Sequence, residues 1–141
     1  MSGVFRRWHE PTGNEFWDNA IELEISLTRF LMNEKFLPKK YRYIYAKPIL
    51  DTVRRMWVHI VAATSIYPKT PELLKEKRDE LKKAIFANET VIQEIQRMVL
   101  VLPIDVNKTD EIGDKLVRES ALLRSARKNS RLQSDCKSEK Q

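Results

Sequence analysis

Apolar residues recur at helical spacing in four stretches of the chain. In the first stretch, large apolar residues follow each other at intervals of two to four, which is typical of one broad helix face. These residues are Trp17, Ile21, Leu23, Leu27, Phe30 and Leu31. Asn14 can cap this helix. We expect the helix to reach Phe36 and to end at Leu37-Pro38, because a residue before proline is driven out of the helical region.

The second stretch runs from Lys39 to Tyr67 and contains a proline. Its apolar face is formed by residues at intervals of three and four. They are Ile49, Val53, Met56, Trp57, Ile60, Val61 and Thr64. Pro48 cannot donate a hydrogen bond to the carbonyl of Ile44. The helix therefore either kinks at Pro48 or restarts there with Pro48 in its first turn, and the pattern does not distinguish these alternatives.

The third and fourth stretches have clear boundaries. Thr70 is a good cap and Pro71 suits a first helical position, while Pro103 ends the third helix. Its inward face is predicted to hold Leu74, Leu81, Ile85, Asn88, Ile92, Ile95 and Val99. Asn88 needs a hydrogen-bond partner if it is buried. After a loop in which Asn107 and Thr109 can supply a cap, the last helix presents Ile112, Leu116, Leu123 and Ala126.

Four amphipathic helices with short connections predict an antiparallel, up-down-up-down four-helix bundle. The 141 residues include only three glycines, which favours helices over a turn-rich sheet fold. We expect an N-terminal arm over residues 1–13, the bundle over 14–130, and a disordered polar tail over 131–141. Three tryptophans and many large apolar residues also favour a homo-oligomer.

The net charge of +6 is unevenly distributed. Residues 1–40 and 71–103 each hold six basic and six acidic residues. The excess lies in the second stretch and in the final helix, which carry clusters of lysine and arginine. If these two helices are adjacent, the clusters would form one patch suited to phosphate backbones of RNA or DNA.

Other interpretations of these residues stay open. Arg54 and Arg55 could pair with glutamates of neighbouring helices, and the final cluster could complement the helix dipole. Tyr41, Tyr43 and Tyr45 interleave with Arg42 and could either stack on bases or pack in the fold.

The sequence contains no motif of a phosphate-binding loop, dinucleotide fold, nucleophile elbow or zinc protease. His59 has no plausible nucleophile beside it, and Cys136 lies alone in the polar tail. With two histidines and one cysteine, a metal site is not expected, and neither is any other cofactor. The chain lacks an apolar run of about 20 residues and an N-terminal signal pattern, so we expect a cytoplasmic, non-catalytic protein without a membrane partner.

Three short motifs resemble a known family. They are Phe36-Leu37-Pro38-Lys39-Lys40-Tyr41-Arg42-Tyr43, then Ala62-Ala63-Thr64-Ser65-Ile66-Tyr67, and Glu111-Ile112-Gly113-Asp114-Lys115-Leu116. The chain is similar, over about residues 14–126, to small four-helix-bundle proteins of ribosomal RNA intervening sequences. That family includes the accessory variability determinant of diversity-generating retroelements.

The resemblance implies a pentameric barrel with a basic surface that binds nucleic acid and a reverse transcriptase. Such a protein would support mutagenic complementary-DNA synthesis on a template RNA without being an enzyme itself. The candidate nucleic-acid-binding residues are Lys39, Lys40, Arg42, Arg54, Arg55, Arg124, Arg127 and Lys128. For Arg42, an ion pair that fixes the corner between the first two helices is an equal alternative. A ribosomal-RNA-associated bundle protein and a plain helical oligomerisation module are the alternative functions.

Overall fold

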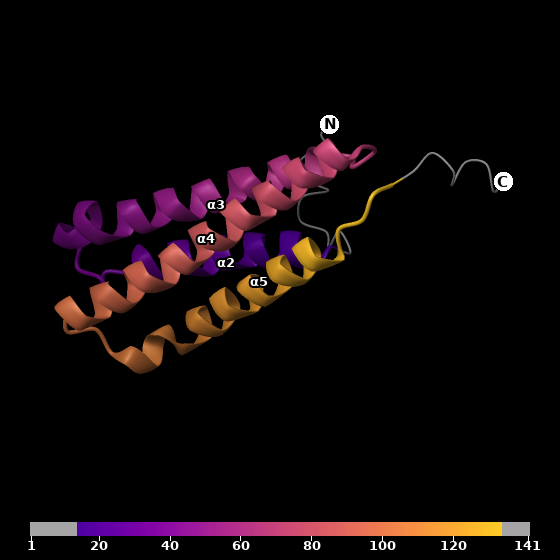
Figure 1. Cartoon of the computed structure of the whole chain (residues 1–141). Helices are drawn as coiled ribbons and strands as arrows, with labels where there is room; N and C mark the ends of the chain where they lie inside the picture. The colour runs from indigo at the N-terminus through magenta and orange to yellow at the C-terminus, as the bar shows by residue number, and fades with distance from the viewer. Residues whose placement is uncertain (1–13, 134–141) are drawn as a thin grey trace, which may run out of the picture.

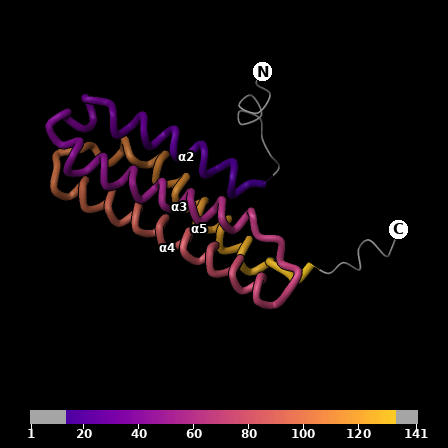
Figure 2. Tube along the Cα trace, turned by 90° about the horizontal axis from the view of Figure 1, so that it is seen from above, coloured from indigo at the N-terminus to yellow at the C-terminus, as the bar shows by residue number. Residues whose placement is uncertain are grey.

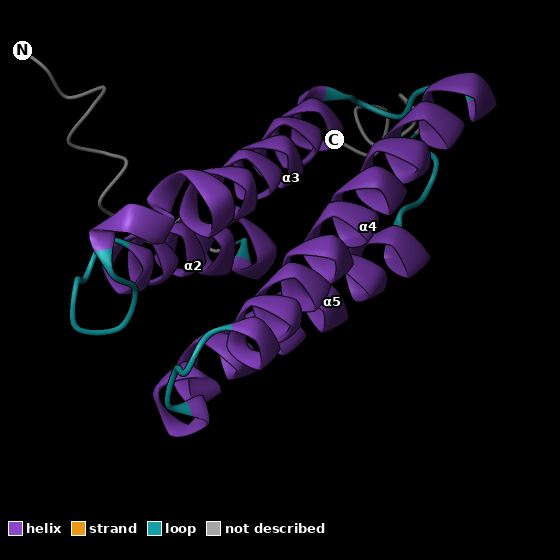
Figure 3. Cartoon of the chain, turned by 90° about the vertical axis from the view of Figure 1, so that its left-hand side faces the viewer, coloured by secondary structure: helices purple, strands orange, loops and turns teal. Residues whose placement is uncertain are grey.

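The computed structural model describes residues 14–133, and this part of the chain is all-helical. Its four long helices are α2 (Glu15–Leu31), α3 (Lys47–Ser65), α4 (Pro71–Val101) and α5 (Asp110–Asn129) (Figure 1). Short helical segments precede α3 and α5, and no strand occurs in residues 14–133 (Figure 3). The predicted all-helical fold with four helices is therefore confirmed.

The four helices run side by side and surround one apolar core (Figure 2). The principal packing partners are α3 with α4, α4 with α5, and α2 with both α5 and α3. Each helix contributes fully buried side chains, among them Leu23, Leu27, Met56, Ile60, Leu81, Met98, Leu116 and Leu123. Burial of one such side chain stabilises the fold by about 1.5–3 kcal/mol, so this core is the main source of stability.

Polar contacts between helices follow a regular order along the bundle. The Thr52 hydroxyl lies 3.1 Å from Glu94 Oε1, and His59 Nδ1 lies 2.7 Å from Glu80 Oε2. Lys77, still earlier on α4, donates to the carbonyl of Ala63 at 2.8 Å. Residue numbers thus rise along α3 as those of their partners on α4 fall.

The first helix ends at Leu31, five residues before the predicted end at Phe36. The Asn33 side-chain oxygen accepts a hydrogen bond from the backbone N–H of Lys35 at 3.0 Å. Such a local side-chain bond competes with the helical backbone pattern and favours a turn. Phe36 instead lies after this turn and stacks on Phe30, with ring centroids 5.2 Å apart.

Pro48 lies in the first turn of α3, as in the second of the two predicted alternatives. The preceding residues form a 3₁₀ turn (η2, Lys39–Tyr41) and a π-helical turn (η3, Arg42–Ala46), in which the backbone N–H of Lys47 donates to the carbonyl of Arg42. In an α-helix the proline ring clashes with the carbonyl four residues earlier, and a wider π turn relieves that clash. The chain therefore enters α3 without a break in helical backbone.

The predicted cap of the third helix is confirmed, and the cap before the last helix is corrected. The Thr70 hydroxyl accepts from the N–H of Leu73 at 3.2 Å, with Pro71 as the first helical residue. Before α5, the side chain of Asp105 accepts from the N–H of Asn107 and caps a 3₁₀ turn, η4 (Val106–Thr109). Thr109 makes no cap bond with its side chain, because its hydroxyl donates to the carbonyl of Val106.

The beginning of the predicted tail contacts the bundle. The N–H of Gln133 donates to the carbonyl of Pro68 at 2.8 Å, in the turn between α3 and α4. Arg78 donates to the carbonyl of Ser130 at 2.7 Å, which ties the same segment to α4. Residues 131–133, the first part of the predicted tail, therefore contact the bundle. Residues 134–141 and the predicted arm over 1–13 lie outside the described residues.

Two buried polar groups join α5 to its neighbours. Asn88 donates through Nδ2 to the carbonyl of Leu116 and to Ser120 Oγ, both at 2.8 Å, which gives its NH₂ group two acceptors, whereas its Oδ1 has no partner among residues 14–133. On the other side of α5, Asn19 donates to Glu119 Oε1 at 2.9 Å. Glu119 is 0% exposed, and its second oxygen has no partner among residues 14–133. Burial raises the pKa of Glu119 from its ordinary 4.5 to about 7, against smaller opposing effects of Asn19 and Arg118.

Replacement of Glu119 by glutamine should change how stability depends on pH. A raised pKa means that the folded state binds the proton more tightly than the unfolded state does. The stability that protonated Glu119 contributes is therefore fully present below pH 4.5 and is lost as pH rises to about 7. The lost contribution is about 3 kcal/mol. Urea unfolding should therefore find Glu119→Gln gaining stability relative to the wild type by that amount between pH 4.5 and 8. Parallel pH profiles would contradict the assignment.

Candidate nucleic-acid interface

A cationic groove lies where the α2–α3 connection meets the first half of α3. We define it by the side chains that line it, which are Met32, Lys39, Arg42, Tyr43, Lys47, Leu50, Asp51 and Arg54. Its lining includes the apolar side chains of Met32 and Leu50, four cations and a single carboxylate. Lys47, Leu50, Asp51 and Arg54 share one face of α3 because they are three or four residues apart.

Arg42 contributes to the corner of the fold as well as to the groove. Its Nη2 donates to the carbonyl of Met32 at 3.0 Å, directly after the end of α2, and lies 3.7 Å from Glu34. The predicted ion pair at the corner between the first two helices is therefore present. Since the side chain is 29% exposed, Arg42 keeps only part of its charge open to a ligand.

Asp51 is the one acidic side chain in the groove, and Lys47 is bonded to it. Lys47 Nζ donates to Asp51 Oδ2 at 2.8 Å. This hydrogen bond lowers the pKa of Asp51, and the charges of Lys47, Arg54 and Arg55 act in the same direction. Asp51 is consequently ionised at neutral pH and offsets part of the positive potential.

Arg54 and Arg55 do not pair with glutamates of neighbouring helices, which was the alternative to their role as nucleic-acid-binding residues. No ion pair joins either residue to a carboxylate within residues 14–133. Arg55 instead donates to the hydroxyl of Thr52 at 3.2 Å. Both side chains are exposed on α3, so their charge is available to an external anion.

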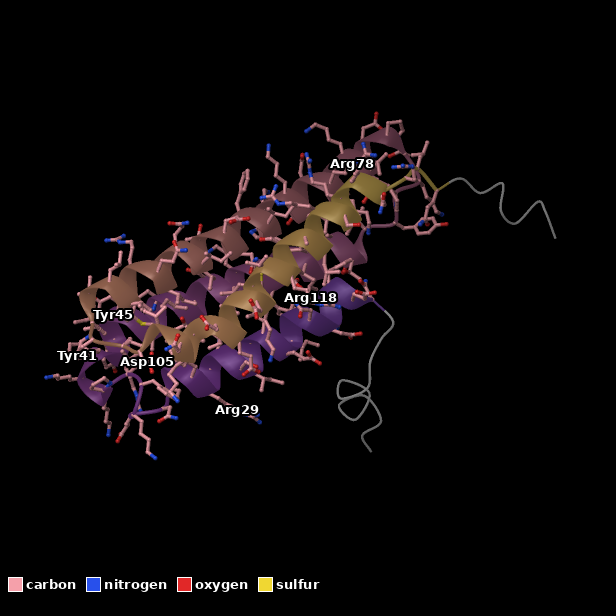
Figure 4. The ribbon with its side chains drawn as sticks, turned by 90° about the horizontal axis from the view of Figure 1, so that it is seen from below. Arg29, Tyr41, Tyr45, Arg78, Asp105 and Arg118 are labelled. Carbon is pink, nitrogen blue, oxygen red and sulfur yellow. The ribbon has the colours of Figure 1, made fainter. Side chains whose placement is uncertain are left out.

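The three tyrosines of the connection have different environments. Tyr41 and Tyr45 are partly buried and pack against the apolar core, at the end of the bundle that also holds Asp105 (Figure 4). Lys40 lies over the ring of Tyr41, 5.1 Å from its centroid, and does not line the groove. Tyr43 is 84% exposed and lines the groove. Packing thus accounts for two of the tyrosines and leaves Tyr43 free to contact a ligand.

The basic cluster of α5 is separate from the cationic groove. Its residues lie at the end of α5, whereas the groove lies at the start of α3, and these two helices are not principal packing partners. Arg124 pairs with Glu89 at 3.0 Å, and Arg127 donates to the carbonyl of Arg78 at 3.3 Å. Lys128, in the last turn, is exposed. The condition for one joint patch, adjacency of the two helices, is therefore not met in the chain.

Sequence reasoning left Lys47 and Asp51 out of the candidate site. Both were visible as charged residues, but only the start of α3 at Lys47 shows that they lie on the same helix face as Arg54. Nothing in the sequence predicts that Tyr43 is exposed, because Tyr41, Tyr43 and Tyr45 are the same type of residue at equal spacing.

Other features of the chain bear on catalysis, metal binding and membrane spanning. His59 is bonded to Glu80, and this hydrogen bond lowers the pKa of the Glu80 carboxyl. Across residues 14–133, no group of three or more potential metal ligands lies together. No helix in that part of the chain is both long and apolar enough to cross a membrane.

Comparison with known proteins adds no relative. No family model matches the chain, and neither a curated protein nor a solved structure matches it.

Arg42 and Arg54 are expected to differ in their effect on stability. Arg42→Gln removes a charged hydrogen bond to the carbonyl of Met32 and should lower the free energy of unfolding by about 1–3 kcal/mol. Arg54→Gln removes an exposed charge and should change it by less than about 0.5 kcal/mol. Urea denaturation monitored by circular dichroism measures both, and equal losses would contradict the structural role of Arg42.

Proposed function

We propose that this protein is a non-catalytic accessory factor of a diversity-generating retroelement, which binds RNA or DNA and a reverse transcriptase in the cytoplasm. The observation that carries the nucleic-acid part is the cationic groove, together with Arg54 and Arg55, which have no ion pair within residues 14–133. The retroelement and polymerase parts rest on the resemblance of the three short motifs.

Phosphate binding suits the charges at the groove better than a purely structural role does. A structural arginine is normally held by a carboxylate or carbonyl, as Arg42 and Arg124 are. Arg54 has no such bond, and Arg55 is bonded only to a neutral hydroxyl. Neutralisation of phosphates by such side chains releases counterions and contributes affinity without requiring a specific sequence.

The proposal includes an antiparallel bundle that assembles into a homopentamer. Antiparallel packing is supported by the order of the cross-helix contacts from Thr52–Glu94 to His59–Glu80. Assembly is supported by an apolar groove between α4 and α5, which Leu100, Val106, Gly113 and Val117 help to line. Leu100, Val106 and Val117 are all exposed in this groove, and a group of exposed apolar side chains is typical of an interaction site. The number of five subunits comes from the family resemblance alone.

Reversal of charge at Arg54 and Arg55 should weaken nucleic-acid binding. For the wild type, affinity for structured RNA should fall steeply between 50 and 200 mM salt, roughly as a power of salt concentration. Arg54→Glu with Arg55→Glu should lower the affinity at least about tenfold and flatten the salt dependence, because fewer phosphates are neutralised. Fluorescence anisotropy with labelled RNA measures both effects.

Two variants serve as controls for this measurement. Lys82→Glu with Lys83→Glu makes the same change in net charge at two exposed, adjacent positions of α4. It should leave most of the affinity intact if binding is local to the groove. Asp51→Asn removes the carboxylate of the groove and should strengthen binding. Equal loss in both double variants would show that only net charge matters and would contradict a defined interface.

The accessory role itself is tested by primer extension with the cognate reverse transcriptase and template RNA. Complementary-DNA synthesis should depend on the protein and should fail with the Arg54→Glu, Arg55→Glu variant. If synthesis is equally efficient without the protein, and the protein does not co-purify with the polymerase, the accessory role is wrong. RNA binding without polymerase dependence would favour the ribosomal-RNA-associated alternative.

The oligomeric state is tested by light scattering at micromolar concentration. We expect a mass of about five chains, and substitution of glutamate for both Leu100 and Val117 should reduce it, since charges in an apolar interface are costly. Val58→Glu, at an exposed position of α3 outside the groove, should keep the wild-type mass. A monomer mass for the wild type would contradict assembly.

A further inference from the structure

Tyr43 is a highly exposed aromatic side chain with several cations around it. Two other exposed aromatic rings, Tyr67 and Phe86, each have a lysine over the ring, at 5.4 and 5.7 Å from the centroid. Tyr43 is 84% exposed, and it shares the cationic groove with Lys39, Arg42 and Lys47. An exposed aromatic ring beside cations can contact a ligand that has both negative charge and an apolar face.

We propose that the cationic groove binds a single-stranded segment of nucleic acid and that Tyr43 stacks on one unpaired base. Lys39 and Arg54 neutralise the flanking phosphates, and Lys47, which is bonded to Asp51, adds part of its charge. The inference rests on the proposed nucleic-acid binding and adds to it the class of ligand and the residue that selects it.

The dimensions of the groove suit a short strand. Lys47 and Arg54 are seven residues apart on one face of α3, which places them about 10 Å apart along the helix axis. This length corresponds to a few consecutive phosphates, and Lys39 and Arg42 extend the positive surface toward the end of α2. The apolar side chains of Met32 and Leu50 in the lining can contact sugars and base edges without competing for phosphate.

An aromatic side chain favours unpaired bases for a geometric reason. In a duplex, the faces of each base are covered by the neighbouring base pairs, so a tyrosine ring finds a free base face only in a single strand, loop or end. Phosphates are present in both forms and are contacted equally by lysine and arginine. Tyr43 is therefore expected to determine the preference for single strands, and the cations the total affinity.

The test compares Tyr43→Leu, which keeps an apolar side chain and removes the ring, with the wild type. The probes are a fluorescein-labelled 12-nucleotide oligoadenylate, an abasic strand of the same length, and a hairpin with the same number of phosphates. Wild type should bind the oligoadenylate on the order of tenfold more tightly than the abasic strand, the usual scale for one stacked base. Tyr43→Leu should lose this difference and bind the abasic strand and the hairpin within about twofold of wild type.

Two further variants address the role of the ring. Tyr43→Phe should keep the preference for oligoadenylate, since stacking needs the ring and not the hydroxyl. Ile44→Ala, at the next residue, which is also exposed but lines a different groove, should behave as wild type. Crosslinking with a strand that carries 5-iodouracil, followed by mass spectrometry, should identify Tyr43.

The outcomes separate this inference from the proposed function. If wild type binds none of the three probes at low salt, nucleic-acid binding itself is wrong, and the inference fails with it. If wild type binds all three probes equally and Tyr43→Leu changes nothing, phosphate binding stands and stacking by Tyr43 is overturned. Crosslinks confined to α5 would also overturn it.

Discussion

The missing backbone N–H of Pro48 is the constraint on which the candidate site depends. Proline cannot donate in the helical ladder, and its ring excludes the carbonyl of an ordinary preceding turn. The chain reaches α3 through a π-helical turn in which Lys47 donates to the carbonyl of Arg42. This turn determines where Arg42 and Tyr43 lie relative to the face of α3 that carries Lys47 and Arg54. The hydrogen bond from Arg42 to the carbonyl of Met32 then fixes the same turn against the end of α2.

The buried polar residues act on a different property, the alignment of the helices. The apolar core alone gives little preference for one register, because leucine and isoleucine side chains can pack in several ways. Asn88 on α4 bonds to the carbonyl of Leu116 on α5, and Glu119 on α5 bonds to Asn19 on α2. If either helix shifted along its neighbour, these buried groups would lose their hydrogen bonds. Glu119 costs stability when it ionises, since its second oxygen has no partner in the part of the chain that the structure describes.

The sequence was sufficient for the elements whose ends are set by local chemistry. Thr70-Pro71 and Pro103 determine the ends of α4 through backbone bonds that involve only near neighbours, and both were predictable. The end of α2 was not, because the apolar pattern continues to Phe36 although the Asn33 side chain has already formed a turn. Apolar spacing reports which residues can be buried, but it does not report whether the backbone between them is helical.

The sequence indicated which basic residues could form the candidate site, but not which of them lie together. Lys39, Arg42 and Arg54 were recognisable as an excess of charge, but whether α3 packs beside α5 is decided by tertiary contacts. The structure pairs α3 with α4, so the cations of α5 lie elsewhere and are engaged in part by Glu89 and the carbonyl of Arg78. The net charge of +6 is therefore larger than the positive charge that one ligand can contact on a single chain. The relevant quantity is the local charge of the groove, whose lining combines four cations and one carboxylate with apolar side chains and an exposed tyrosine. If this groove binds nucleic acid as proposed, its small charged area and single exposed ring favour a short unpaired segment over an extended duplex.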